Sequence, residues 1–103
     1  MPEIASHDER RAHPRYKCVK PVEITVVRKV VKGFSIDIGE GGISFIFDTM
    51  VAPGNVTLAL PEIGLVKDCR ILNAHPSDRA GFYRHQAQFK SPLLTAQLEQ
   101  LLT

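Results

Sequence analysis

Hydrophobic and polar residues alternate along most of this chain with a period of two. Val22, Ile24 and Val26 form the first such run, in which every second side chain would lie on the same side. This period is typical of β-strands that have one buried face. Similar runs follow at residues 30–38, 43–47, 56–60, 65–74 and 82–89. The pattern predicts an all-β fold of about six strands.

The segments between these runs are short and contain turn residues, such as Pro53 and Gly54. Strands that follow one another at short intervals pair as antiparallel neighbours, and a sheet that closes on itself hides its edges. We therefore expect a small antiparallel barrel or sandwich.

The end of the chain has a different period. Leu94, Leu98, Leu101 and Leu102 are spaced as residues on one face of a helix. Ser91 can cap this helix, and Pro92 suits its first turn. The pattern predicts a short C-terminal α-helix packed on the sheet. The leucine stripe could also mediate self-association, so a homo-oligomer formed through this helix is a second expectation.

The first residues show no period. Residues 1–10 mix Pro, Glu, Ser, His, Asp and Arg and offer little apolar surface to anchor them. Pro14 disfavours helical backbone at His13, so residues 11–18 are expected to be extended or turning. We expect a flexible arm over residues 1–10 and one folded domain over residues 11–103.

Composition and charge narrow the class of protein. The chain has 103 residues, of which 44% are hydrophobic and 23% charged, as in an ordinary globular domain. Its formal net charge is only +2, and it lacks the dense basic stripe of a general nucleic-acid binder. Any site for an anion must therefore be local.

Cysteines and histidines give no sign of a metal site. Cys18 and Cys69 form no Cys-x-x-Cys pair, so reduced thiols in a cytosolic protein are expected. The histidines lack metal-ligand spacing and are expected on the surface or in loops: His7, His13, His75 and His85. No apolar run reaches the ~18 residues that span a bilayer, and the first residues lack the apolar core of a signal peptide. We expect a cytoplasmic protein without membrane insertion.

One corner of the predicted sheet combines a carboxylate with glycines. Asp37 ends one apolar run, and Gly39, Gly41 and Gly42 follow it before the next run begins. Glycine has no Cβ and adopts positive φ readily, so such a corner can bend sharply and admit another backbone or a ligand. Asp37 could also simply accept hydrogen bonds from the turn.

A pair of arginines precedes the first predicted strand. Arg11 and Arg15 have the spacing Arg-x-x-x-Arg. This spacing, followed about twenty residues later by an Asp-x-Ser-x-x-Gly corner, is the two-part signature of the PilZ domain. The chain resembles that family from Glu9 to Leu102, although its corner has Gly39 where the family most often has serine.

The resemblance implies a fold, a ligand and a set of contacts. The fold is a six-stranded antiparallel β-barrel with a short C-terminal helix. The ligand is cyclic di-GMP, a bacterial second messenger, and no cofactor is implied. Arg11 and Arg15 would contact guanine and phosphate, Asp37 would accept from the guanine edge, and Arg10 would contact a second, stacked ligand molecule. The corner would provide room and backbone N–H groups through Gly39, Gly41 and Gly42.

The chemistry of these residues suits a guanine nucleotide. The O6 and N7 atoms of guanine accept two hydrogen bonds from one guanidinium, and its N1–H and N2–H groups donate to an ionised carboxylate. Arginine also stacks on purines and binds phosphate oxygens. Together with this chemistry, the resemblance to the PilZ family implies a cyclic di-GMP receptor that changes conformation and signals to an effector protein, which the sequence does not identify.

An enzyme is not expected. Ser35 and Ser44 have no histidine at a catalytic spacing, and the glycine corner lacks the Lys-Ser/Thr of a phosphate-binding loop. One alternative to the receptor remains open, and a third possibility is disfavoured. The chain could be a degenerate PilZ-like module that binds proteins and no nucleotide. A nucleic-acid-binding barrel is disfavoured because the aromatic residues fall at core-facing positions: Phe45, Phe47 and Phe89.

Overall fold

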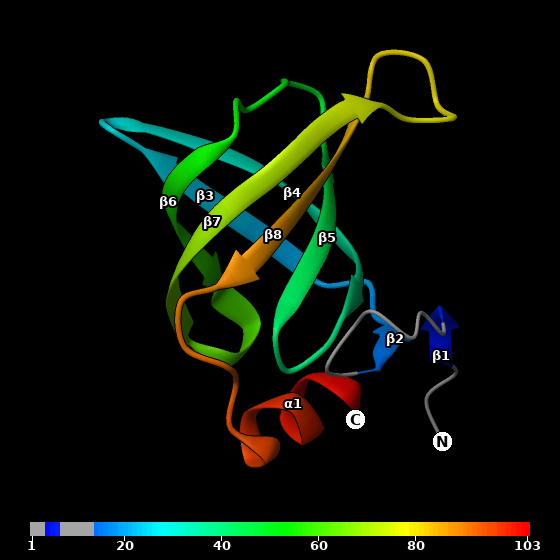
Figure 1. The fold of residues 1–103 in the computed structure, drawn as a ribbon, viewed down its shortest axis with the longest axis vertical. Helices are drawn as coiled ribbons and strands as arrows, with labels where there is room; N and C mark the ends of the chain where they lie inside the picture. Colours follow the sequence, from blue (N-terminus) through cyan, green and yellow to red (C-terminus); the bar gives the residue numbers. More distant parts are fainter. Residues whose placement is uncertain (1–3, 7–13) are drawn as a thin grey trace.

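The computed structural model describes residues 4–6 and 14–103, with residues 4–6 described by their backbone alone. Within it, six strands form a closed antiparallel barrel (Figure 1). They are β3 (Pro21–Val26), β4 (Lys29–Ile38), β5 (Gly42–Phe47), β6 (Gly54–Leu60), β7 (Leu65–Pro76) and β8 (Tyr83–Phe89). Their order around the barrel is β4-β3-β6-β7-β8-β5, and the pairing of β4 with β5 closes it. The predicted all-β, six-stranded antiparallel barrel is confirmed.

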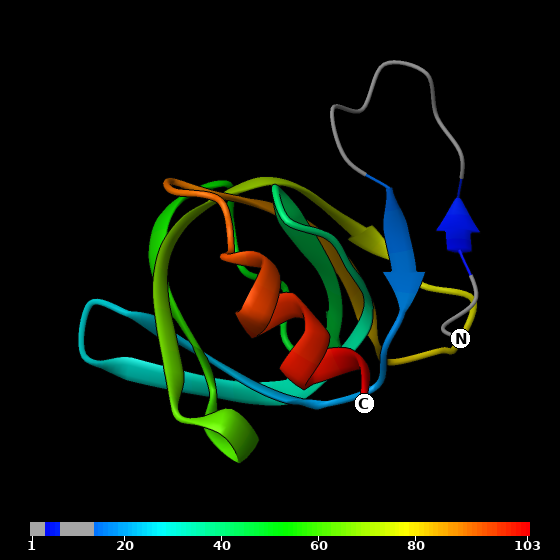
Figure 2. The ribbon, with the colours of Figure 1, turned by 90° about the horizontal axis from the view of Figure 1, so that it is seen from below.

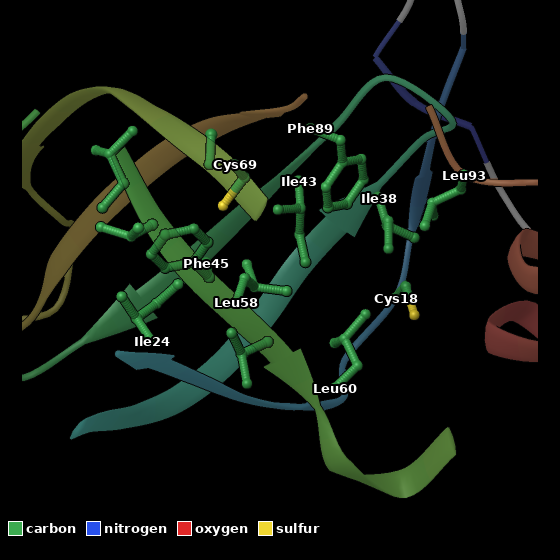
Figure 3. Packing of buried hydrophobic residues seen from close by; sticks show 14 of the residues in the cluster. Cys18, Ile24, Ile38, Ile43, Phe45, Leu58, Leu60, Cys69, Phe89 and Leu93 are labelled. Carbon is green, nitrogen blue, oxygen red and sulfur yellow. The ribbon is translucent and has the colours of Figure 1, made fainter. Parts of the chain in front are cut away.

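Alternate side chains of these strands fill the barrel (Figure 3). Phe45 and Phe47 are buried with ring centroids 4.9 Å apart. The core-facing position predicted for Phe89 is also confirmed. Around these rings lie buried aliphatic residues from each of the other strands: Val22, Ile24, Ile38, Leu58, Leu60 and Ile71. The period of two in the sequence therefore marks the buried face, where apolar area stabilises the fold at ~25 cal/mol per Å².

Two short strands extend the sheet at the edge of the barrel. Strand β2 (Arg15–Lys17) pairs with the last residues of β4, beyond the part of β4 that pairs with β3. Strand β1 (Ile4–Ser6) pairs in turn with β2. The extended backbone predicted after Pro14 is present in β2, whereas β1 was not predicted. The boundary between an arm and a domain at residue 10 lies outside the described residues and stays a prediction.

A short helix covers one end of the barrel (Figure 2). Helix α1 (Thr95–Leu102) follows β8, and the 3₁₀ turn η1 (Pro61–Ile63) links β6 to β7. The predicted cap at Ser91 is wrong, because the helix begins at residue 95, where the Leu94 N–H donates to Gln97 Oε1 at 2.9 Å. Leu93 and Leu98 are both buried, whereas Leu94 is 68% exposed and lies outside the stripe to which it was assigned.

His85 does not lie on the surface as predicted. It is fully buried inside the barrel on β8, and its ring stacks on Phe45 with centroids 5.2 Å apart. The backbone N–H of Val51 donates to His85 Nε2 at 2.9 Å, so Nε2 carries no proton. Burial lowers the pKa of His85, and backbone groups of Tyr83 and Phe45 oppose this shift only in part. A neutral histidine therefore belongs to the core.

Candidate functional site

The candidate site lies on the outer face of the barrel, where β4 and β5 pair and β2 joins them. The register between these two strands shifts between Ser35 and Asp37. After this irregularity Asp37 pairs with Ser44, whereas Ile38 pairs with Ile43 and faces the core. The bulge therefore directs the Asp37 carboxylate out of the barrel, next to β2.

Asp37 forms ion pairs with two arginines from different strands. Arg15 Nη1 on β2 lies 2.8 Å from Asp37 Oδ1, with the side chains 13% and 6% exposed. Arg84 Nη2 on β8 lies 3.5 Å from Asp37 Oδ2, with the Arg84 side chain 40% exposed. A nearly buried carboxylate requires such partners because an unpaired charge there is strongly destabilising. In these two pairs, two guanidinium groups share one carboxylate.

The glycine corner is packed tightly against Arg15. A Cβ atom on Gly39 would lie 2.5 Å from the Pro14 carbonyl oxygen and 3.1 Å from Arg15 Cδ. A Cβ atom on Gly42 would lie 2.8 Å from Arg15 Nη2 and 2.5 Å from the Ala87 carbonyl oxygen. Neither glycine has positive φ. The corner therefore uses the missing side chain of glycine rather than its conformational freedom, and this lets Arg15 reach Asp37.

The corner is also bonded to the segment that leads into α1. Gly39 N–H donates to the Gly42 carbonyl at 2.9 Å and closes the turn. The Phe89 N–H donates to the Gly41 carbonyl at 3.0 Å, and the Leu93 N–H donates to the Glu40 carbonyl at 2.8 Å. A displacement at the corner would therefore reach the chain just before the helix.

Of the predicted site residues, the structure brings together Arg15, Asp37, Gly39 and Gly42. Gly41 lies in the same corner and contributes its carbonyl oxygen to the bond with Phe89. Arg10 and Arg11 lie outside the described residues, so their assigned contacts stay predictions.

Two residues of the site were missed by the sequence analysis. Arg84 contacts Asp37 from a strand 47 residues away in sequence. Ser44 is fully buried, and its Oγ has no hydrogen-bond partner within the described part of the chain. The alternation along β5 and β8 places both side chains on the outer face, but no local pattern indicates that β8 pairs with β5 beside Asp37. Only the order of strands in the barrel reveals this.

The two cysteine thiols lie in the core, away from the outer face that carries the candidate site, and are protected by burial. Cys18 and Cys69 are free and buried. Burial raises the pKa of the Cys69 thiol to about 11, so it stays protonated at neutral pH. Over residues 14–103 no group of three or more metal-ligating side chains occurs. The described helices are too short to cross a bilayer.

Comparison with known proteins gives one family match. The model of the PilZ domain family matches residues 9–103 of this chain. No curated protein matches the sequence.

Two solved structures share the fold. One is the inhibitor of motility MotI/DgrA from Bacillus subtilis, with a TM-score of 0.67 and 16% identity over 94% of this chain and 50% of that chain. The other is the complex of K. pneumonia MrkH with c-di-GMP, with a TM-score of 0.59 and 18% identity over 98% of this chain and 59% of that chain. The present chain therefore spans between half and three-fifths of the length of these two proteins.

Proposed function

The chain belongs to the PilZ domain family, and on this premise we propose that it is a receptor for cyclic di-GMP that signals to a partner protein through a change in conformation. One observation carries the proposal. Residues of both family motifs meet in space, because Arg15 contacts Asp37 and packs on the two glycines that flank the corner. The complex of MrkH with c-di-GMP, which has the same fold, supports the choice of ligand.

Binding requires an exchange of partners at Asp37. In this structure Arg15 Nη1 donates to Asp37 Oδ1 at 2.8 Å. Guanine offers N1–H and N2–H donors that can replace this contact, and the released guanidinium can then bind a phosphate or the O6 and N7 atoms of guanine. The buried carboxylate keeps hydrogen-bond partners throughout, so the exchange avoids the penalty of an unpaired charge.

Further contacts to the ligand come from neighbouring residues. Arg11 is proposed to bind guanine or phosphate with Arg15, and Arg10 to contact a second, stacked ligand molecule. Gly39, Gly41 and Gly42 are proposed to line the nucleotide site, and the missing side chains of Gly39 and Gly42 leave the room in which Arg15 lies. The unpaired hydroxyl of Ser44, across from Asp37 in the sheet, offers one more hydrogen bond to a bound ligand.

Movement of Arg15 is the step by which ligand binding could alter the surface that a partner protein contacts. The corner is hydrogen-bonded to Leu93 through Glu40, and the Cys18 thiol, which follows β2, lies 3.6 Å from the Leu101 carbonyl oxygen on α1. Both segments that flank the ligand site therefore contact α1 or the chain leading to it. We propose that ligand binding shifts β2 and the corner and alters the surface around α1, where an effector protein is recognised.

Calorimetric titration with cyclic di-GMP tests the proposal, with GTP and a short single-stranded oligonucleotide as comparison ligands. We expect cyclic di-GMP alone to bind, and Arg15→Ala to weaken binding about tenfold or more, as for a lost charge-assisted bond. Arg28→Ala is the matched control, because Arg28 is exposed at the opposite end of β4. Absence of binding by the folded wild-type protein would instead support a PilZ-like module that binds only proteins.

A further inference from the structure

We propose that Arg84 determines the specificity of the site for guanine over adenine, an inference that rests on the proposed function. Arg84 belongs to neither family motif, but its guanidinium lies 3.5 Å from the Asp37 oxygen that Arg15 does not contact. The Arg84 guanidinium, a donor group, therefore lies beside the two acceptor oxygens of Asp37 on the outer face of the barrel.

This arrangement is complementary to one edge of guanine. The Watson–Crick edge of guanine presents the O6 acceptor, then the N1–H donor and then the N2–H donor. Arg84 can donate to O6, Asp37 Oδ2 can accept from N1–H, and Oδ1 can accept from N2–H once Arg15 has left it. Each oxygen of a carboxylate accepts more than one bond, so Oδ2 can bind N1–H and keep Arg84.

Adenine does not fit the same arrangement. Its N6–H donor would face the Arg84 guanidinium, and its N1 acceptor would face a carboxylate oxygen. A site built to satisfy one pattern of donors and acceptors rejects a base that leaves buried polar groups unpaired. The Arg84–Asp37 pair therefore discriminates by mismatch as well as by attraction.

The positions of the two arginines in the fold support different roles for them. Arg84 lies within β8, which is paired on both sides, with Ile46 of β5 and His75 of β7 as its register partners. Arg15 is the first residue of a strand of only three residues, which lies outside the closed barrel between β1 and the last residues of β4. Arg84 is thus held by rigid neighbours and is 40% exposed, so it can bind a base without leaving Asp37. Arg15 is the arginine that can move away.

The experiment compares two cyclic dinucleotides of equal charge, cyclic di-GMP and cyclic di-AMP, by calorimetric titration. The proteins are wild type, Arg84→Ala and the charge-matched control Arg28→Ala. We expect Arg84→Ala to lower the affinity for cyclic di-GMP about tenfold or more. The affinity for cyclic di-AMP should stay the same or rise, because the donor that faces N6–H is removed. Arg28→Ala is expected to bind both as wild type does.

Two results would overturn the assignment. An Arg84→Ala variant that keeps the wild-type affinity for cyclic di-GMP removes Arg84 from the site. Equal weakening of both dinucleotides would show that Arg84 contributes only charge. If the alanine variant does not fold, Arg84→Met gives the same comparison, because it keeps much of the length of the side chain and removes every hydrogen-bond donor.

Failure of this inference is distinct from failure of the proposed function. A wild-type protein that does not bind cyclic di-GMP contradicts both. A wild-type protein that binds it, with discrimination unchanged by Arg84→Ala, contradicts the role of Arg84 alone.

Discussion

Buried polar groups differ in charge between the inner and the outer face of the barrel formed by β4, β5 and β8. On the inner face, His85 lies among Phe45 and Phe47 and is kept neutral. On the outer face, Asp37 is almost as deeply buried and forms ion pairs with two arginines. A strand alternates between the faces at every residue, so a neutral core and a charged site lie one position apart.

His85 and Asp37 differ in charge because the fold brings different partners to each of them. Inside the barrel, His85 accepts a hydrogen bond from the Val51 N–H and lies among aromatic rings. No group there balances a positive charge among the described residues, so the neutral imidazole is the stable form. Outside it, β2 and β8 bring guanidinium groups to the carboxylate. The Asp37 carboxylate is paired with arginine side chains, and a ligand can replace such a partner. The neutral ring of His85 in the core contributes only packing. This contrast separates the structural face from the candidate binding face, and each of the following changes tests it.

The largest expected effect is on the inner face. Phe45→Ala should lower the free energy of unfolding by about 3–5 kcal/mol, because it removes a buried ring and leaves a cavity. Phe34→Ala is the matched control, since Phe34 lies on the outer face of β4 and is 53% exposed. It should change stability by less than about 1 kcal/mol. Urea denaturation of both variants measures the difference, and equal losses would contradict the assignment of the two faces.

On the outer face, Arg15→Ala should lower stability by about 1–3 kcal/mol, because Asp37 loses its closer partner and stays buried. The double variant Arg15→Ala/Asp37→Ala should be more stable than Arg15→Ala alone, since no buried carboxylate remains with only the more distant Arg84 as its partner. Thermal melts of the two variants make the comparison. A double variant less stable than the single one would show that the pair is not what stabilises this face.

Substitution of Gly39 tests the packing between the corner and β2. Gly39→Ala and Gly39→Ser should both lower the melting temperature, by the equivalent of about 1–3 kcal/mol, because a Cβ atom would collide with the Pro14 carbonyl. The hydroxyl separates the two variants. If the position faces the ligand, the serine variant should bind cyclic di-GMP up to about tenfold tighter than the alanine variant. Equal affinities would place Gly39 away from the ligand.

The smallest expected effect is the pH dependence due to His85. Its pKa is lowered in the folded protein, so the unfolded chain binds more protons below the usual pKa of about 6.5. The stability that comes from neutral His85 is therefore complete above that pH and is lost as the pH falls toward the folded pKa. His85→Gln, which keeps an acceptor for the Val51 N–H, should lose less stability between pH 7.5 and pH 5. These pH values are about one unit or more on either side of the usual histidine pKa. Urea denaturation at both pH values gives the comparison, and identical losses would rule out this role for His85.

The barrel strands and most residues of the candidate site could be predicted from the sequence alone. The period of two predicts all six barrel strands because each has one apolar face, and this is a local property of the chain. Arg15 and Asp37 could be identified from the two motifs, because a motif is defined by residue types and spacing along the chain. The start of α1 was misplaced because a cap depends on backbone geometry that Ser91 does not reveal.

Which side chains meet in the site depends on the tertiary fold. Closing the barrel pairs β5 with β8 and so brings Arg84 to Asp37 across 47 residues of sequence. The bulge between Ser35 and Asp37 turns the carboxylate outward, and burial of β8 makes His85 a core residue rather than a surface one. These contacts depend on register and strand order. The packing of the whole sheet sets both, so neither can be predicted from a single segment of the sequence.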